Sequence, residues 1–136
     1  MPDTYRGSCL CGAVTFEVAG RFTAFYTCHC SRCRKATGSS NAANLFVESG
    51  AVRWRTGERL VTSFSLSTAS YFNAAFCSVC GSHVPRKARS GDFEIIPAGS
   101  LDDPPLIAPD RAIFWDDRAP WFEQSCLARR YSRYGD

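Results

Sequence analysis

Cys28-His29-Cys30-Ser31-Arg32-Cys33 places three thiols within six consecutive residues. Two cysteine pairs flank this stretch along the chain, Cys9-Leu10-Cys11 and Cys77-Ser78-Val79-Cys80. A packed core gains nothing from thiols two or three positions apart, whereas such spacings let sulfur atoms from one turn meet one soft metal ion. The sequence therefore predicts a fold organised around metal-binding turns.

Seven of the eight cysteines lie in these clusters, which divide into four and three. Zinc takes four thiolates in a closed structural site, or three protein ligands in a site that keeps one position open. We therefore expect one closed and one open zinc site. Each flanking pair is followed by glycine, which lets the backbone wrap around an ion. The expected closed site joins the two pairs, Cys9, Cys11, Cys77 and Cys80.

The central cluster, Cys28, Cys30 and Cys33, has no fourth cysteine close in sequence and fits an open site that receives water or a thiol. We expect Ser31 to cap a short helix over 32–37 that ends at Gly38, because serine favours the first and glycine the last position. Cys33 would then lie in the first helical turn, where the helix dipole favours a thiolate.

Basic residues in this helix are candidate contacts for the carboxylate of a substrate thiol: Arg32, Arg34 and Lys35. A solvated helix face explains them equally well. A second closed structural site, completed by His29 or the remote Cys126, also stays open. We expect His29 to be a hydrogen-bonding group beside the metal, His83 to be a half-buried histidine, and Cys126 to be a single buried thiol.

Strand patterns dominate the rest of the chain, and the predicted fold is mainly β. One domain over 1–136 is expected, because its length suits a single core and no linker interrupts it. The tail over 129–136 is expected to be a loose, solvated end. Segments rich in alternating apolar and β-branched residues predict strands over 13–18, 51–55, 60–64, 70–76, 92–96 and 112–115.

The formal charge of +3 is weak evidence for nucleic-acid binding. Seven thiolates contribute seven negative charges against four positive ones from two zinc ions, which brings the net charge to about zero. Met1 to Arg6 is polar and predicts no signal peptide, and no stretch is long enough for a membrane span. We therefore expect a cytoplasmic protein with reduced cysteines rather than a disulfide scaffold. Cys77-Ser78-Val79-Cys80 could also form a redox pair, but the βαβ pattern expected around such a pair is absent. An iron–sulfur cluster is supported by the ligand type alone.

Three segments together resemble the glutathione-dependent formaldehyde-activating enzyme family, which includes the centromere protein V-type domains. They are Gly7-Ser8-Cys9-Leu10-Cys11-Gly12-Ala13-Val14, Cys28-His29-Cys30-Ser31-Arg32-Cys33-Arg34-Lys35 and Phe76-Cys77-Ser78-Val79-Cys80-Gly81-Ser82-His83. Ala98-Gly99-Ser100-Leu101-Asp102-Asp103-Pro104 and Arg118-Ala119-Pro120-Trp121 are similar to its later, weaker motifs. The likeness extends from about residue 6 to residue 121.

The resemblance implies a tent-like zinc fold of small antiparallel sheets, with one short helix after the central cluster. It implies a structural zinc on the two flanking pairs and a second zinc, loosely bound or absent in some members, on the central cluster. The implied activity is a carbon–sulfur lyase reaction that condenses glutathione with formaldehyde to S-hydroxymethylglutathione.

Two positions depart from the family pattern. The segment Phe72-Asn73-Ala74-Ala75-Phe76 lacks the basic residue that often precedes the last cysteine motif, and Ala112 stands where many members have histidine. If these positions orient a substrate, the chain uses a different thiol.

The leading hypothesis is a zinc enzyme for a glutathione-like thiol and an aldehyde, and the alternative is a non-catalytic zinc- or thiol-binding module.

Overall fold

The computed structural model describes residues 4–135. The prediction drawn from the first residues, Met1 to Asp3, lies outside them, as does Asp136 of the tail. The strands are β1 (Thr4–Ser8), β2 (Thr15–Ala19), β3 (Ala24–Cys28), β4 (Ala42–Glu48), β5 (Val52–Thr56), β6 (Val61–Ser65), β7 (Asn73–Cys77), β8 (Arg86–Lys87), β9 (Phe93–Pro97) and β10 (Arg111–Ile113). The helices are α1 (Ser31–Thr37), α2 (Phe122–Cys126) and the 3₁₀ turns η1 (Glu58–Leu60), η2 (Ala98–Ser100) and η3 (Trp115–Asp117).

The strands form three small sheets, in the orders β1-β2-β5, β10-β3-β4-β9-β8 and β6-β7. Every pairing is antiparallel except that of β10 with β3, which is parallel. A parallel pair needs a long connection, and here most of the chain separates the two strands. The predicted mainly β fold with small sheets and few helices is confirmed, and the parallel pair is a difference from the expected antiparallel sheets.

The main core lies between the first two sheets. Strands β1, β2 and β9 alternate buried and more exposed residues, as expected for strands with one face on a core. Phe16 and Val18 of β2 meet Leu45 and Val47 of β4 there, with Ile96 of β9. Each fully buried side chain of this kind contributes about 1.5–3 kcal/mol through removal of apolar surface from water.

A second, smaller apolar cluster surrounds the flanking cysteine pairs. Cys9 and Cys77 are buried in it together with Val14, Ala75 and Val84. Trp54 of β5 packs against both clusters and so joins them. One cysteine of each pair is therefore part of the packed interior.

All six predicted strands occur, within about two residues of their expected bounds at most ends. Strands β1, β3, β4 and β8 were not predicted, nor was α2. β4 is the central strand of its sheet, and its sequence Ala42-Ala43-Asn44-Leu45-Phe46-Val47-Glu48 lacks a clean alternation because two adjacent residues, Asn44 and Leu45, are both buried.

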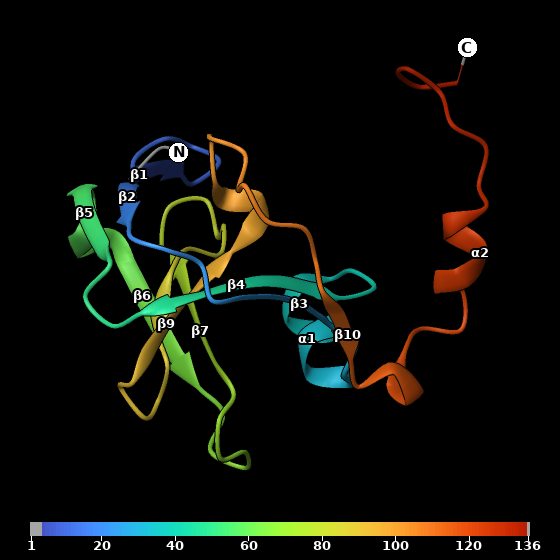
Figure 1. Ribbon diagram of the computed structural model, residues 1–136, viewed down its shortest axis with the longest axis horizontal. Coiled ribbons are helices and arrows are strands. Elements are labelled where there is room, and N and C mark those ends of the chain that lie inside the picture. The colour runs from blue at the N-terminus through green and yellow to red at the C-terminus, as the bar shows by residue number, and fades with distance from the viewer. Residues whose placement is uncertain (1–3, 136) are drawn as a thin grey trace.

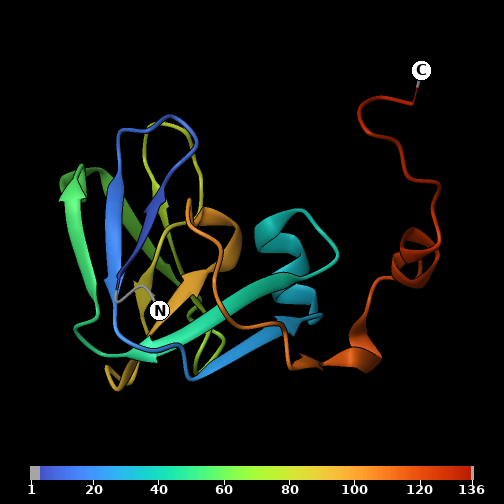
Figure 2. The same ribbon diagram turned by 45° about the horizontal axis from the view of Figure 1, so that its top comes forward.

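The chain after β10 runs to one side of the sheets in both views (Figures 1 and 2), and only the first residue of α2, Phe122, is found against His29 beside β3 among the aromatic contacts of the described residues. Cys126, at the end of α2, is exposed, so the expectation of a single buried thiol is wrong. Its apolar neighbours suggested burial, but Leu127 is 87% exposed as well, because this segment does not pack on the core. No helix among residues 4–135 is long and apolar enough to cross a membrane.

Candidate functional site: two cysteine clusters and a cavity

The flanking cysteine pairs meet in space. The sulfur atoms of Cys9, Cys11, Cys77 and Cys80 all lie within 4.8 Å of one another. The Cys9 and Cys11 sulfurs are 3.5 Å apart, and those of Cys11 and Cys77 are 4.0 Å apart. These distances are far longer than the roughly 2.05 Å of a disulfide bond.

This cluster fits a tetrahedral zinc ion. With zinc–sulfur bonds of about 2.3 Å, the sulfurs of a tetrahedral site lie about 3.8 Å apart, between the two observed distances. Backbone N–H groups of Val14 and Val79 donate to the sulfurs of Cys9 and Cys77 at 3.3 and 3.4 Å. Such donors stabilise thiolates, and the hydrogen bond with the Ser82 hydroxyl lowers the pKa of Cys80 to about 5.

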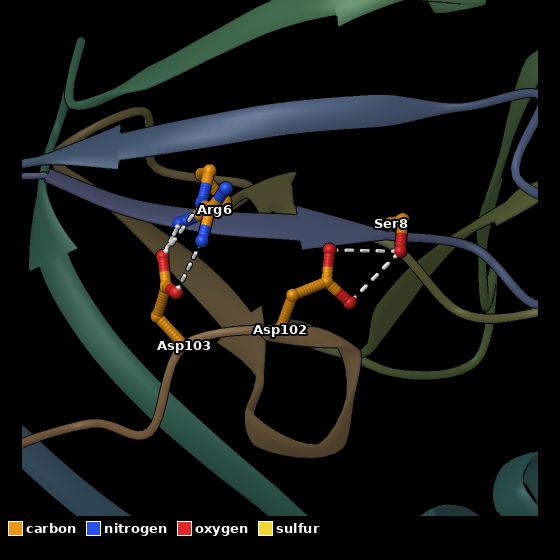
Figure 3. A network of polar contacts seen from close by, with 4 residues as sticks. All are labelled: Arg6, Ser8, Asp102 and Asp103. Carbon is orange, nitrogen blue, oxygen red and sulfur yellow. Dashed lines mark hydrogen bonds and ion pairs between the residues drawn. The ribbon is translucent and has the colours of Figure 1, made fainter.

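A polar strap holds the strand that leads into Cys9. Figure 3 shows Arg6 and Ser8 of β1 facing Asp103 and Asp102, which follow η2. The Arg6 guanidinium donates to both carboxylate oxygens of Asp103, at 3.2 and 3.0 Å. The Ser8 hydroxyl lies 2.9 Å from each carboxylate oxygen of Asp102. The segment from Ala98 to Pro104 therefore fixes the approach of β1 to the four-cysteine cluster.

The central cluster also comes together, since the sulfurs of Cys28, Cys30 and Cys33 lie within 4.8 Å of one another. Among the described residues, neither His29 nor Cys126 belongs to this group. The hydrogen bond from Cys33 lowers the pKa of Cys28 to about 6, while the pKa of Cys33 is raised. A cation in the cluster would favour the thiolate form of all three cysteines and displace the protons that they hold.

The start of α1 differs from the expectation. Cys30, not Ser31, is the N-cap, and its sulfur accepts a hydrogen bond from the Cys33 backbone N–H at 3.3 Å. Cys30 takes this role because its backbone is extended (φ −66°, ψ 158°) and Ser31 is already helical. The predicted stop at Gly38 is confirmed, with φ +63° in the left-handed region.

His29 does not join the three thiols and packs against two aromatic rings. Its ring lies 5.1 Å from that of Trp115 and 4.7 Å from that of Phe122, centroid to centroid. It is almost fully buried, Nε2 is 3.4 Å from the Thr27 hydroxyl, and Nδ1 has no partner within the described part of the chain. Burial and the nearby Arg118 lower the pKa of His29, which favours the neutral ring.

A cavity of about 340 Å³ opens beside Cys33. Its wall contains polar groups from four residues: Asn44 of β4, Asn73 of β7, Arg86 of β8 and His83, which precedes β8. Three of these four residues come from the segment that runs from β7 to β8 and contains the Cys77–Cys80 turn. Because Cys33 of the central cluster and Ser82 next to that turn both line the cavity, it lies between the two cysteine clusters.

The three basic residues predicted to contact the substrate do not line the cavity beside Cys33. Arg32 and Lys35 line a second cavity of about 400 Å³, whose walls are mainly apolar and include Phe64 and Phe76. Arg34 has a buried Nε without a partner in the described chain. His83 is half-buried, as expected, and reaches both this cavity and the one beside Cys33.

Sequence reasoning missed Arg86 and Asn73. Arg86 donates from Nε to the Asn73 side-chain oxygen at 2.9 Å, so a basic group is held against the segment 72–76 that has no basic residue of its own. Nothing in the local sequence marks Arg86, because Pro85-Arg86-Lys87 carries no cysteine, glycine or periodic pattern. Ala112, the second departure, is paired with Thr27 in the parallel strand pair.

The chain resembles one protein family and solved structures. A crystal structure of a Rhodobacter sphaeroides protein is similar in fold, with a TM-score of 0.57 and 24% identity over 79% of this chain and 98% of that one. None of the curated proteins compared matches the chain. The model of the family described as glutathione-dependent formaldehyde-activating enzyme matches residues 4–117. That span contains both cysteine clusters and the strap, and the chain belongs to this family.

Proposed function

We propose that this protein is a zinc-dependent enzyme of the carbon–sulfur lyase type. It would join a glutathione-like thiol to an aldehyde such as formaldehyde, or release the aldehyde from the adduct. The observation that carries the proposal is the three-thiol cluster of Cys28, Cys30 and Cys33 with a cavity at its edge. The family is one associated with glutathione-dependent formaldehyde activation, which supports this choice of substrates.

Cys9, Cys11, Cys77 and Cys80 would hold a structural zinc. Four thiolates fill a tetrahedral site and leave no position for a substrate, and Cys9 and Cys77 are buried in an apolar cluster. This assignment gives the first cluster a role in folding and leaves the chemistry to the second.

Cys28, Cys30 and Cys33 would hold the second zinc and leave one position free for the sulfur of the substrate thiol. When bound, zinc lowers the pKa of a coordinated thiol, so the nucleophile exists as thiolate at neutral pH. In the forward direction the sulfur lone pair forms the carbon–sulfur bond, the carbonyl π electrons move to oxygen, and that oxygen takes up a proton. The reverse direction breaks the same bond and returns the electron pair to sulfur.

Three thiolates give a zinc site a net charge of −1, and a substrate thiolate raises this to −2. Arg32, Arg34 and Lys35 on α1 are proposed to balance part of this charge and to contact the substrate. Arg32 and Lys35 line a cavity that adjoins the site through His83, which is consistent with that role. A cytoplasmic location and a small-molecule partner, rather than nucleic acid, remain part of the proposal.

The test is the rate at which glutathione thiol disappears when formaldehyde is added to the zinc-loaded protein. We expect a rate above the spontaneous reaction, and loss of the excess in Cys30→Ser. Circular dichroism and zinc content must show that this variant is folded with the first site filled. A wild-type rate equal to the spontaneous one would overturn the enzyme proposal and favour a non-catalytic zinc- or thiol-binding module.

A further inference from the structure

The cavity beside Cys33 contains an arginine whose charge is not matched by any acidic side chain of the described residues. Arg86 lines the cavity and is half-buried. The ion pairs found over residues 4–135 involve Arg6, Arg55, Arg111 and Arg118, and none involves Arg86. A guanidinium removed from water loses hydration energy unless an anion or several acceptors replace it.

Arg86 is held in one orientation by Asn73. Its Nε donates to the Asn73 Oδ1 at 2.9 Å, and the Asn73 Nδ2 donates to the Lys87 carbonyl at 2.9 Å. Both ends of the amide are therefore occupied, and the amide oxygen is fixed toward the arginine. Strands β7 and β8, from different sheets, supply the two residues.

This arrangement leaves the outer edge of the guanidinium free. Only Nε has a hydrogen bond among the described residues, so the two terminal NH₂ groups keep their donors available. Two parallel N–H donors on a planar fork match the two oxygens of a carboxylate. A fork fixed in advance also loses less conformational entropy when an anion binds.

The electrostatics agree with a site for a negative group. Burial lowers the pKa of Arg86, and the nearby Cys33 thiol acts in the opposite direction, which places the arginine within range of the central cluster. The guanidinium nevertheless remains charged at neutral pH, because arginine is effectively always protonated in proteins. An anion entering the cavity would meet this charge at one wall and the thiol cluster at another.

We propose that Arg86 binds the carboxylate of the substrate thiol while the sulfur of that thiol completes the Cys28/Cys30/Cys33 metal site. This inference rests on the proposed function and narrows its substrate class to thiols that carry a carboxylate. Asn73 is a positioning residue that acts through Arg86. An uncharged thiol of the same size would bind through its sulfur alone.

The experiment compares two probes that share one sulfur: 3-mercaptopropionate and its uncharged methyl ester. Each is titrated into full-length protein loaded with Co²⁺, and thiol binding is followed by the sulfur-to-cobalt charge-transfer absorbance. We expect the wild-type protein to bind the acid about ten- to a hundredfold more tightly than the ester, the range given by hydrogen bonds to a charged group. Arg86→Gln should reduce this ratio to about one without changing the affinity for the ester.

Lys87→Gln is the matched control, because Lys87 is the next residue, is exposed and does not line this cavity. It should keep the wild-type ratio. Arg86→Lys should recover part of the preference, since ammonium keeps the charge but not the fork. Asn73→Ala should lower the ratio although Arg86 itself is unchanged, because the arginine loses the hydrogen bond that orients it. Circular dichroism and metal content confirm that each variant is folded and loaded.

The outcomes separate the inference from the proposed function. Equal wild-type affinity for acid and ester overturns the inference alone. An equal loss of both affinities in Arg86→Gln, or loss of one metal, also overturns it, because Arg86 would then only balance the charge of the thiol cluster. If neither thiol changes the cobalt spectrum, thiol ligation is wrong and both fall. If the acid is preferred but no aldehyde turnover occurs, the inference stands and the enzyme proposal falls.

Discussion

The sulfur atoms of Cys11 and Cys77 lie 4.0 Å apart although 66 positions separate the residues in the chain. Cys11 belongs to the turn between β1 and β2, and Cys77 ends β7. These strands belong to two different sheets, which meet in the small apolar cluster around Cys9 and Cys77. A metal ion at this point would link the two sheets directly.

Cys80→Ser should therefore unfold the domain or lower its thermal stability severely. Apparent binding free energies of structural zinc are about 10–16 kcal/mol in small peptides, as large as the whole stability of a typical domain of about 5–15 kcal/mol. Thermal unfolding by circular dichroism, together with zinc content, measures the effect. Cys126→Ser is the control, because that thiol is exposed and outside both clusters, and it should leave stability unchanged. Equal stability of the two variants would contradict a structural four-cysteine site.

Chelation should remove metal in two stages. We expect about two zincs per chain in untagged protein prepared without chelator. The three-cysteine site should lose its zinc first, with little change in circular dichroism, because three ligands bind less tightly than four and the site is open to the cavity. Loss of the second zinc should coincide with unfolding. Cys30→Ser should begin with about one zinc and show only the later stage, and a single cooperative release from wild type would argue against two distinct sites.

Both cysteine groupings were predictable from the sequence because ligands of one turn are local in the chain. The pairing of Cys9/Cys11 with Cys77/Cys80 followed from counting ligands against the four positions of zinc. The predicted strands were those with alternating or β-branched patterns, such as Thr15–Ala19.

The cavity could not be predicted in the same way. Arg86 and Asn73 meet because β7 and β8 are brought together by the fold, and thirteen positions of chain, including the Cys77–Cys80 turn, separate them. The helix cap was assigned to Ser31 from average preferences, but the cysteine sulfur of Cys30 provides the acceptor instead. Cys126 was expected to be buried because its neighbours are partly apolar, and composition does not reveal that α2 leaves the core (Figure 1).

His83 should titrate below the ordinary histidine value of 6.5. Burial, and then the charge of Arg86, lower the pKa of His83. Above about pH 6.5 the ring is neutral in both folded and unfolded chains, so it adds no pH dependence. As the pH falls below that value, the unfolded chain binds a proton that the folded chain does not, and the free energy of unfolding decreases.

Proton NMR of the histidine rings between about pH 5.5 and 8 measures this pKa, and His83→Gln assigns the signal, since the chain contains two histidines. Arg86→Gln should move the pKa of His83 upward by removing the nearby positive charge. A His83 pKa at or above 6.5 in the wild-type protein would contradict the half-buried position of the ring.

Gly57→Ala should destabilise the protein more than Gly50→Ala does. Both glycines have positive φ, +72° and +92°, so alanine at either position costs about 1–2 kcal/mol of backbone strain. A Cβ at Gly50 meets open space, whereas one at Gly57 collides with the backbone carbonyl of Ala13. The collision should add about 1–3 kcal/mol, as other overpacked sites do.

The same collision should weaken the four-cysteine site. Ala13 precedes Val14, whose N–H donates to the Cys9 sulfur at 3.3 Å, so a shifted Ala13 carbonyl displaces that donor. Urea unfolding gives the stability difference between the two variants, and competition with a chromogenic chelator gives the zinc affinity. Gly50→Ala should lose stability but keep the wild-type zinc affinity, whereas Gly57→Ala should lose both. Identical behaviour of the two variants would mean that the turn at Gly57 moves without disturbing Cys9.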